Sequence, residues 1–333
     1  MSTAKSRLAR FVGYPLYFVS AFLAFAYLTF PYERLRDFLV QELEYPAGPG
    51  GRRIASGYRV SIVELEPYWL TGVELTGVRI EREAREAGKP KVDMTMSSVT
   101  ARLQILPLFT KTAKVAFDLE GGGGTLEGSY ATSFDQTSTA IDVEAHDVVM
   151  QRLGPIREEI GVPVRGIVDG HVELDLPQRA DQSSGEIDLR IRNFELGDGE
   201  AKIPLPSMPS GLTIEPIRTG TLSIAMNVEA GVGTIRRFQA SGPDVDLGAE
   251  GNVHFAHPLS MSRLDILLRA RFKDAYRNKS PRTQALFGLL DMNQVLRSAR
   301  TPDGALQVRL RGSPSTRVLP TPAGDERFGA RRR

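Results

Sequence analysis

Residues 166–196 read GIVDGHVELDLPQRADQSSGEIDLRIRNFEL, two runs of alternating side chains joined by a polar turn. Valine, leucine and isoleucine recur at every second position, and charged residues fill most of the positions between them. Successive side chains of a strand point to opposite faces, so the pattern predicts two strands with one apolar and one solvated face. The short turn between them is typical of an antiparallel sheet.

The same alternation recurs along most of the chain. Similar runs, separated by Gly, Pro or Asp, fall at residues 58–65, 72–80, 92–106, 114–119, 140–149, 219–228, 233–242, 244–255 and 305–312. Glycine pairs such as Gly166 and Gly170 lie in or beside the strands, where they indicate bulges or bends. We therefore predict a mainly-β fold: an N-terminal transmembrane helix, then a large, curved, mostly antiparallel sheet, groove-like or partly closed, with two short helices.

The domain layout follows from the breaks in this pattern. The two helices are expected at residues 151–160 and after Ser280 and Pro281, a favourable helix start. The β-rich domain covers residues 58–318. A Pro-rich stretch at 203–216 cannot form a central strand, so it is a long loop or an edge that divides the domain. Residues 46–57 are expected to be a linker and residues 319–333 a disordered tail.

An uncharged stretch near the N-terminus, residues 11–31, is close to the ~20 residues that cross a bilayer core. Three basic residues precede it, and the first acidic residue, Glu33, follows it. The positive-inside rule then leaves residues 1–10 in the cytoplasm and places the rest across the membrane. The sequence AFA ending at Ala26 resembles a signal-peptide cleavage site, and cleavage there is the alternative to a permanent anchor. The domain is exported in either case.

An amphipathic helix is predicted directly after this stretch, at residues 32–45. Leu35, Phe38, Leu39 and Leu43 fall at helical spacing, with charged residues between them. The helix either lies on the lipid headgroups or caps one end of the sheet. Because its charges are mixed in sign, we expect the cap.

Little in the sequence suggests catalysis. The absence of cysteine excludes thiolate metal sites and cysteine nucleophiles, and there is no HExxH or GxSxG motif. The glycine run 121–124 lacks the lysine of a phosphate-binding loop. Of the four histidines only His254 and His257 are close in sequence, without a third ligand nearby. We expect a protein that is not an enzyme and has no cofactor or metal.

Two further expectations concern partners and the core. The formal net charge of +2, from 42 basic and 40 acidic residues, provides no overall field to recruit nucleic acid. The sole tryptophan, Trp69, lies in a turn-like segment between two strands, where we expect it to plug the end of the core.

One set of alternating apolar residues is predicted to share the inward face of the sheet. These residues fill a closed core, or they line a groove for lipid acyl chains; a structure separates the two. The set comprises Val99, Leu103, Ile105, Val115, Phe117, Ile167, Val172, Leu174, Ile187, Leu189, Ile191, Leu222, Ile224 and Met226.

Five segments, in a fixed order over residues 12–314, carry a resemblance to a known family. They read FPYERLRDFL, EPYWLTGVELTGVRI, SVTARLQILPLFTKTAKVAFDLEGGGGTLEGSY, QRLGPIREEIGVPVRGIVDGHVELDL and DGALQVRLRGSP. With the apolar stretch before them, they resemble the type II secretion system protein N (GspN) family. The resemblance implies a non-catalytic accessory component of the secretion apparatus, a single-pass protein of the bacterial inner membrane with its bulk in the periplasm. It also implies contacts with other secretion-system subunits, and it brings no catalytic residues.

A looser similarity runs to AsmA-like lipid-transport proteins. It rests on the N-terminal apolar stretch, on LQILPLF at residues 103–109 and on the glycine-bracketed strands. This similarity implies the alternative function, a lipid-binding or lipid-transfer module with an apolar β groove. The chain departs from those proteins in its length, which is too short to bridge a periplasm alone.

Overall fold

The computed structural model of the protein describes residues 14, 17, 18, 20–22, 25, 27, 29–46, 53, 55–82, 92–121, 123–135, 137–152, 163–200, 202–205, 208–213, 215–256, 261–292, 297–313 and 317–329. Within this part of the chain, no helix combines the length and the apolar character needed to cross a bilayer. About half of the predicted transmembrane stretch 11–31 lies outside the described residues, and so does the predicted helix at 151–160 beyond Arg152.

Fifteen strands form one large sheet, and their pairings are antiparallel. The order is β1-β3-β4-β5-β6-β7-β8-β9-β12-β13-β14-β15-β16-β17, and β2 also pairs with β3. The prediction of a mainly-β fold with a large antiparallel sheet is confirmed. The strands are β1 Arg59–Ser61, β2 Glu64–Tyr68, β3 Gly72–Arg82, β4 Val92–Gln104, β5 Thr112–Gly121, β6 Gly124–Ser133, β7 Thr139–Val149, β8 Val164–Leu176, β9 Ser184–Leu196, β12 Ile217–Glu229, β13 Val232–Ser241, β14 Val245–His254, β15 Arg263–Phe272, β16 Leu306–Ser313 and β17 Arg317–Pro322.

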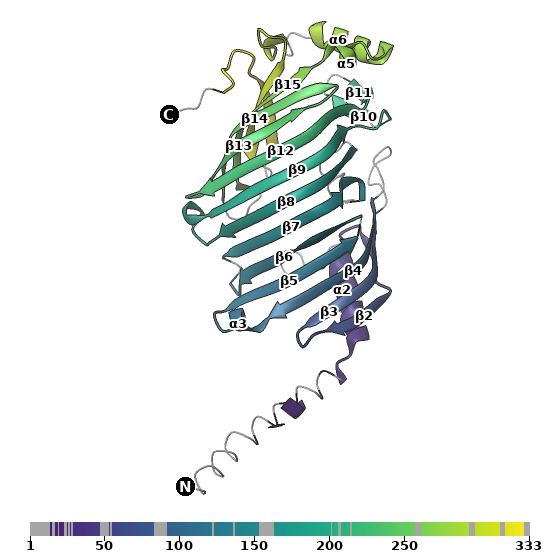
Figure 1. Cartoon of the computed structure of the whole chain (residues 1–333), viewed down its shortest axis with the longest axis vertical. Coiled ribbons are helices and arrows are strands. Elements are labelled where there is room, and N and C mark those ends of the chain that lie inside the picture. The colour runs from purple at the N-terminus through teal and green to yellow at the C-terminus, as the bar shows by residue number, and fades with distance from the viewer. Residues whose placement is uncertain are drawn as a thin grey trace.

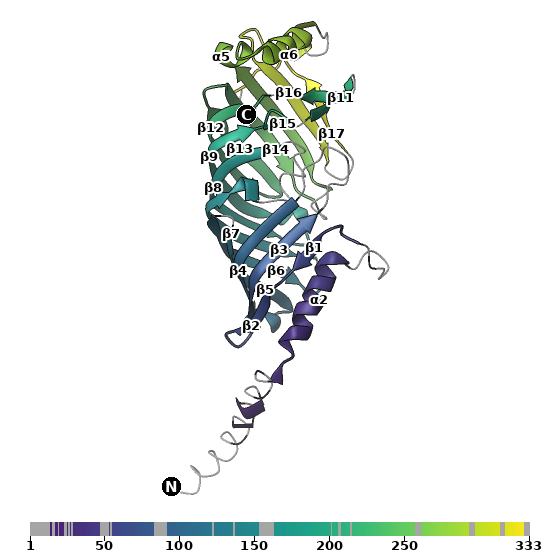
Figure 2. The same cartoon turned by 90° about the vertical axis from the view of Figure 1, so that its right-hand side faces the viewer.

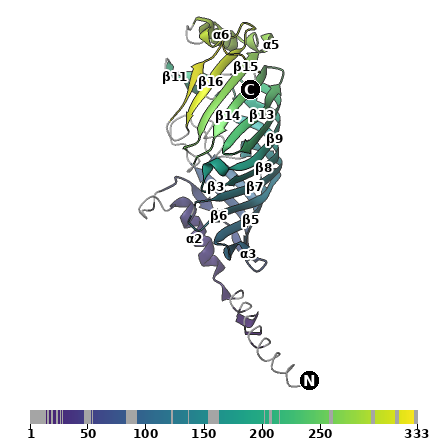
Figure 3. The ribbon, with the colours of Figure 1, turned by 90° about the vertical axis from the view of Figure 1, so that its left-hand side faces the viewer.

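The sheet is curved, with an outer and an inner face. Figure 1 views the outer, convex face, with α2 (Tyr32–Glu44) and the yellow strands β16 and β17 behind it. Figure 2 is turned by 90° and shows the sheet curling around the side on which α2 lies. Figure 3, from the opposite side, shows α2 beside the N-terminal strands at the end where the chain begins.

Glycines allow neighbouring strands to approach closely where the sheet bends. A Cβ atom on Gly170 would lie 2.1 Å from the carbonyl oxygen of Asp188 on the next strand, and the φ angle of Gly170 is +145°. A Cβ atom would meet a neighbouring carbonyl at the same 2.1 Å on Gly128, Gly185 and Gly251. Only a residue without a side chain fits there, and glycine kinks of this kind bend sheets.

The helix α2 covers the inner face at the N-terminal end of the sheet, as the second alternative for residues 32–45 predicts. The residues of α2 that pack on the strands are Tyr32, Leu35, Leu39 and Val40. The predicted partners Phe38 and Leu43 are instead 52% and 51% exposed, because the packed side of the helix passes through the four residues just named. The Glu44 carboxylate accepts the backbone N–H of Val60 at 2.9 Å and so ties α2 to β1.

Two helices, α5 (Asp274–Arg277) and α6 (Pro281–Met292), cover the other end of the inner face. Tyr276 and Phe287 are buried there against Ile217 and Val245. Burial raises the pKa of the Tyr276 hydroxyl, which donates a hydrogen bond to a backbone carbonyl and stays protonated.

The predicted helix start is confirmed, because Pro281 is the first residue of α6 and the Ser280 hydroxyl accepts the backbone N–H of Thr283 at 3.3 Å. Three short helices of the described residues were not predicted: α3 (Ile105–Leu108), η3 (Ala180–Gln182) and α5. A further short helix, η2 (Met150–Arg152), includes the first two residues of the helix predicted at 151–160.

The Pro-rich stretch does not divide the domain. Its described residues form a separate two-stranded hairpin of β10 (Lys202–Leu205) and β11 (Met208–Thr213). The strands on either side of it, β9 and β12, pair directly with each other, so the main sheet continues without a break.

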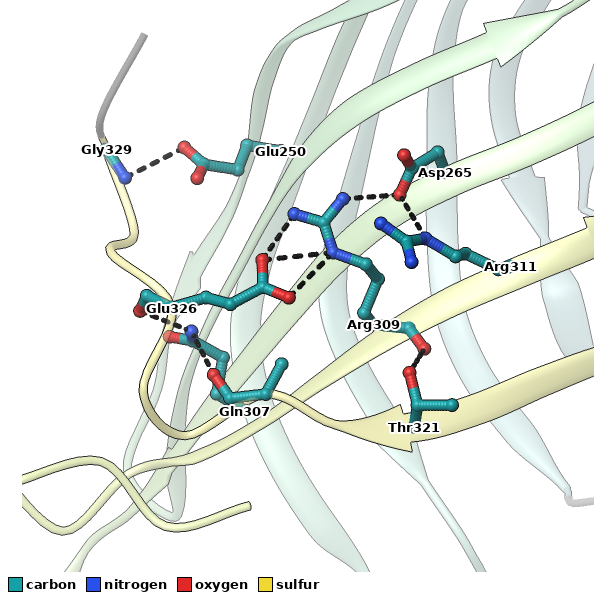
Figure 4. A network of polar contacts seen from close by, with 9 residues as sticks. Glu250, Asp265, Gln307, Arg309, Arg311, Thr321, Glu326 and Gly329 are labelled. Atoms are coloured by element: carbon teal, nitrogen blue, oxygen red, sulfur yellow. Dashed lines mark hydrogen bonds and ion pairs between the residues drawn. The ribbon is translucent and has the colours of Figure 1, made fainter. Parts of the chain in front are cut away.

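Residues 319–329, expected to belong to a disordered tail, are ordered. They complete β17 and then fold back over the outer face (Figure 4). The Gln307 amide donates to the backbone carbonyls of Ala323 and Glu326, each at 2.8 Å. Arg309 pairs with the carboxylates of Glu326 and Asp265. These side chains hold the tail in place, and no short-range sequence pattern marks them.

Candidate functional site

Four rows of apolar residues cross the strands on the inner face, and neighbours in each row are register partners. The first is Leu75, Val99, Leu119, Leu126, Ala145, Gly170, Leu189, Ile224 and Phe238. The second is Val73, Ala101, Phe117, Gly128, Val143, Val172, Ile187, Met226 and Ile235. The third is Leu103, Val115, Tyr130, Ile141, Leu174, Gly185, Val228, Gly233, Val253, Leu264 and Gly312. The fourth is Val148, Val168, Ile191, Leu222, Ala240, Leu247, Ala270 and Leu306. No member of the rows carries a charge.

The rows are buried at some places and open at others. Leu75 and Leu222 are buried, where α2 or neighbouring side chains cover the face. In the middle strands most of the row residues are only partly buried, and Tyr130 keeps 44% and Leu103 36% of its surface exposed. Ala145, Val148 and Ile191 are buried there. A sheet normally hides its apolar face under a second layer. Over the middle strands, the described residues provide no such layer.

Three clusters hold many of the buried apolar residues, and the second and third share Leu196 and Leu247 at their margins. One lies under α2 on β1–β5, one on β8–β14 beside η2, and one under α5 and α6. Among the described residues, no cluster joins the first strands to the last across the curve. The sheet therefore curls without closing on a filled core.

The outer face of the same strands is polar. Asp142, Glu173, Glu186 and Asp188 alternate with the row residues of β7, β8 and β9. Arginines pair with several outer-face carboxylates; the Arg79 guanidinium, 2.9 Å from Asp93, holds the pKa of that carboxyl below its usual range through a hydrogen bond.

Twelve of the fourteen predicted inward residues lie in the rows: Val99, Leu103, Val115, Phe117, Val172, Leu174, Ile187, Leu189, Ile191, Leu222, Ile224 and Met226. The other two were placed wrongly. Ile105 begins α3 at the end of β4 and is 51% exposed. Ile167 pairs with Arg192 and lies five positions before the inward Val172, so alternation along β8 turns its side chain to the outer face.

Other row members were missed. Tyr130, Ile141 and Val143 lie in the middle of the inner face, between the predicted residues of β5 and β8. They alternate with polar residues as the predicted ones do, so strict alternation through β6 and β7 was the signal that could have found them.

Trp69 does not plug the core. It lies at the tip of the β2–β3 turn with 67% of its surface exposed and a φ angle of +53°. A positive φ is unfavourable for a bulky residue and is typical of a tight turn. The tip of this two-strand hairpin lies beyond the end of the packed strands, which explains the exposure.

Polar chemistry on the described surface is sparse. Glu127, Glu144 and His146 have side-chain ligand atoms within 4.8 Å of one another on the outer face, but all three are exposed. His146 lies 3.2 Å from Glu144 and 3.9 Å from Glu127, as expected of surface ion pairs on a sheet. The arrangement offers no buried nucleophile or acid–base pair.

The feature that distinguishes this molecule is thus an uncharged, partly uncovered inner face bounded by a helix at each end. No known family model, curated protein or solved structure matches the chain, so the inner face stands as the principal clue to function.

Proposed function

We propose that this protein is a membrane-anchored lipid-binding module that holds acyl chains against the inner face of its curved sheet. The single observation that carries the proposal is the set of apolar rows, which continue across strands β5–β9 without a charge and without a second protein layer among the described residues.

The energetics favour a flexible apolar ligand. Each methylene group moved from water to an apolar surface contributes about 0.8 kcal/mol. Rows of valine, leucine and isoleucine offer such a surface over several strands, and the glycines in the rows place no side chain between the larger ones, which makes the surface uneven. An acyl chain can adapt to this relief, whereas the absence of charged groups disfavours a polar ligand.

The anchor belongs to the same proposal. The uncharged stretch 11–31 would hold the protein at the inner membrane, with the sheet in the periplasm. The ring of the described residue Phe30 packs at a tilt against Tyr32 at the start of α2, with the ring centroids 4.9 Å apart. The anchor would therefore lead directly into the helix that covers the inner face. Lipids would then be available at the end of the sheet where α2 lies.

A role as an accessory of type II secretion, implied by the GspN resemblance, is compatible with lipid binding. However, one route for partner proteins, pairing with a sheet edge, is disfavoured at β17 and at β1. At β17, the Ala323 N–H points toward β16 and donates to the Gln307 carbonyl. Backbone N–H groups alternate in direction along a strand, so the positions of Pro320 and Pro322 face the free edge of the sheet, and proline has no N–H to offer an added strand there. At β1, the Val60 N–H is already bonded to Glu44.

The test is the lipid content of the full-length protein purified in mild detergent. We expect native mass spectrometry to find bound phospholipid. Adjacent residues provide matched variants: Val143 and Val172 pair on the inner face, and Asp142 and Glu173 pair beside them on the outer face. The double variant V143N/V172N should lose lipid, and D142N/E173N should retain it. Equal lipid content in both variants would contradict the proposal.

A second measurement does not depend on variants. A phospholipid with a photoreactive group on its acyl chain should crosslink to row residues of the wild-type protein. Crosslinks confined to the outer face would exclude the inner face as the binding surface.

A further inference from the structure

Three consecutive turns at one end of the strands carry large exposed apolar side chains. They are the β2–β3 turn, the α3 segment between β4 and β5, and the β6–β7 turn. We call them the apolar turns. Their exposed residues are Trp69 at 67%, Leu70 at 79%, Ile105 at 51%, Leu106 at 82%, Phe109 at 82% and Phe134 at 60%.

Backbone hydrogen bonds join these turns into one continuous surface. Leu103 N–H donates to the Thr71 carbonyl at 3.1 Å, and the Thr71 hydroxyl donates back to the Leu103 carbonyl at 2.7 Å. Phe134 N–H donates to the Lys111 carbonyl at 3.0 Å. The exposed side chains are therefore neighbours on a fixed edge and not the scattered apolar residues of an ordinary surface.

The apolar turns occupy the part of the edge nearest the start of α2, and farther along the edge the described large apolar residue exposed before β15 is Met261, at 56%. Figure 1 shows α3 and the strands β2 and β3 at the end of the sheet where α2 begins, and Figure 3 shows α3 and α2 at this end. Farther along the same edge, the β8–β9 turn carries Gln178, Gln182 and an ion pair of Arg179 with Asp181. This change from apolar to polar turns indicates a surface with one specific occupant.

The composition of the first two turns fits a bilayer. Residues 69–71 and 105–111 contain tryptophan, phenylalanine and leucine, and their only charged residue is Lys111. Tryptophan favours the membrane–water interface, aliphatic side chains favour the acyl region beneath it, and a lysine suits anionic headgroups. Trp69 also adopts a positive φ angle, so the turn exposes its ring despite a backbone cost.

We propose that the apolar turns insert into the outer leaflet of the membrane that anchors the chain, and so hold the adjoining end of the inner face against the lipid surface. The inference rests on the anchoring part of the proposed function, and it adds a second, separate membrane contact. That contact would fix the orientation of the sheet and give acyl chains a short path from the leaflet to the rows.

Trp69 reports on this contact directly, because the chain has no other tryptophan. The experiment uses the full-length protein reconstituted into phosphatidylcholine vesicles, with and without bromine atoms on the acyl chains. We expect Trp69 emission to shift to shorter wavelength on reconstitution and to lose intensity in the brominated vesicles. Emission typical of water that bromine does not quench would overturn the inference, and the same result would point to a protein partner for the turns.

A pair of variants separates insertion from unrelated effects. L106D/F109D places two charges in the α3 turn and should restore the long-wavelength, unquenched emission of Trp69. Q178D/Q182D places two charges in the polar β8–β9 turn and should leave the wild-type signal unchanged. Unchanged quenching in L106D/F109D would overturn the inference.

Two further readouts distinguish this inference from the proposed function. Flotation of the vesicles measures whether the protein is anchored. If the protein floats but Trp69 is not quenched, only the insertion of the apolar turns is overturned. If the protein does not float, both the insertion and the membrane anchor are overturned. The lipid content of the detergent-purified L106D/F109D protein measures lipid binding by the rows. We expect it to equal that of the wild type, because the turns lie outside the rows.

Discussion

The inner and outer faces of the sheet are built by the same strands but differ in polarity. On β8, Val172 and Leu174 point inward and carry no polar atom, while His171, Glu173 and Asp175 point outward into solvent. The outer face is stable in water without a partner. The inner face is covered by α2 at one end and by α5 and α6 at the other, and its middle remains partly exposed.

This difference teaches that the strands alone do not form a conventional core. A curved sheet with a single apolar face gains stability only where something covers that face. The protein covers the ends itself, and we infer that lipid covers the middle. Mutations on the inner face should therefore differ in cost from mutations on the outer face, and the inner-face glycines should be the most sensitive of all.

The largest expected effect is that of Gly170→Ala. The new methyl group would lie 2.1 Å from the Asp188 carbonyl oxygen on the next strand, at a φ angle of +145° that alanine rarely adopts. Relief requires the strands to separate, so we expect a loss of about 3 kcal/mol or more in unfolding free energy. Denaturant unfolding followed by circular dichroism measures it.

Gly288→Ala is the matched control for that substitution. Gly288 lies in α6, where a new methyl group would meet nothing within 4 Å beyond the backbone of its own helix. We expect a gain of up to about 1 kcal/mol, the difference in helix propensity between the two residues. Wild-type stability in the Gly170 variant would contradict the role of glycine in bending the sheet.

The second prediction compares adjacent residues of β12. Leu222 lies in the fourth row and is 3% exposed, whereas its neighbour Ser223 faces outward. We expect Leu222→Ala to lower the unfolding free energy by about 2–4 kcal/mol, through lost burial and the cavity left behind. Ser223→Ala should change it by less than about 0.5 kcal/mol. Equal losses would show that the two faces do not differ in the way described.

Much of this two-faced sheet could be predicted from sequence, because alternation is a local signal. The runs at 166–176 and 185–196 correspond to β8 and β9, with boundaries displaced by at most two residues. The strand β15 was missed, since Ile266, Leu267 and Leu268 interrupt its alternation; Leu267 lies on the outer face beside Arg309 and is buried there.

The rest depends on interactions between residues far apart in sequence. Arg309 and Glu326 are 17 residues apart and order the tail through ion pairs. The exposure of Trp69 depends on how far its hairpin extends beyond the sheet. Alternation therefore predicted the rows, and only the structure showed that the described residues leave their middle partly exposed.

A smaller effect is expected from the outer face, where charge pairs hold the C-terminal tail. The hydrogen bond from Arg309 lowers the pKa of Glu326 below its usual range, against a smaller opposing effect of burial. Because the carboxylate is 40% exposed, Glu326→Gln should cost only about 0.5–1 kcal/mol at neutral pH. Thermal unfolding of the variant and the wild type over a range of pH measures this.

The stability difference between the wild type and Glu326→Gln should depend on pH, because the pKa of Glu326 is lowered in the folded state. A carboxyl group with a lowered pKa in the folded state stabilises the protein fully above its unfolded pKa, about 4.3 for glutamate, and loses this contribution as the pH falls through the folded value. The gap between wild type and Glu326→Gln should therefore be constant near neutrality and close in acid. A gap that widens in acid would contradict the ion pair as its cause.

The smallest expected effect is a gain, from Trp69→Gly. Tryptophan at a φ angle of +53° strains the turn, and its exposed ring contributes little burial, so glycine should stabilise the protein in detergent by about 0.5–1 kcal/mol. Ala230→Gly is the control, because Ala230 has a φ angle of +50° in a turn farther along the same edge, and should give a similar gain. If Trp69→Gly lowered the stability and Ala230→Gly did not, the expectation that Trp69 packs into the core would be restored. Equal gains in stability for both variants would mean that the tryptophan ring is retained for a contact outside the fold.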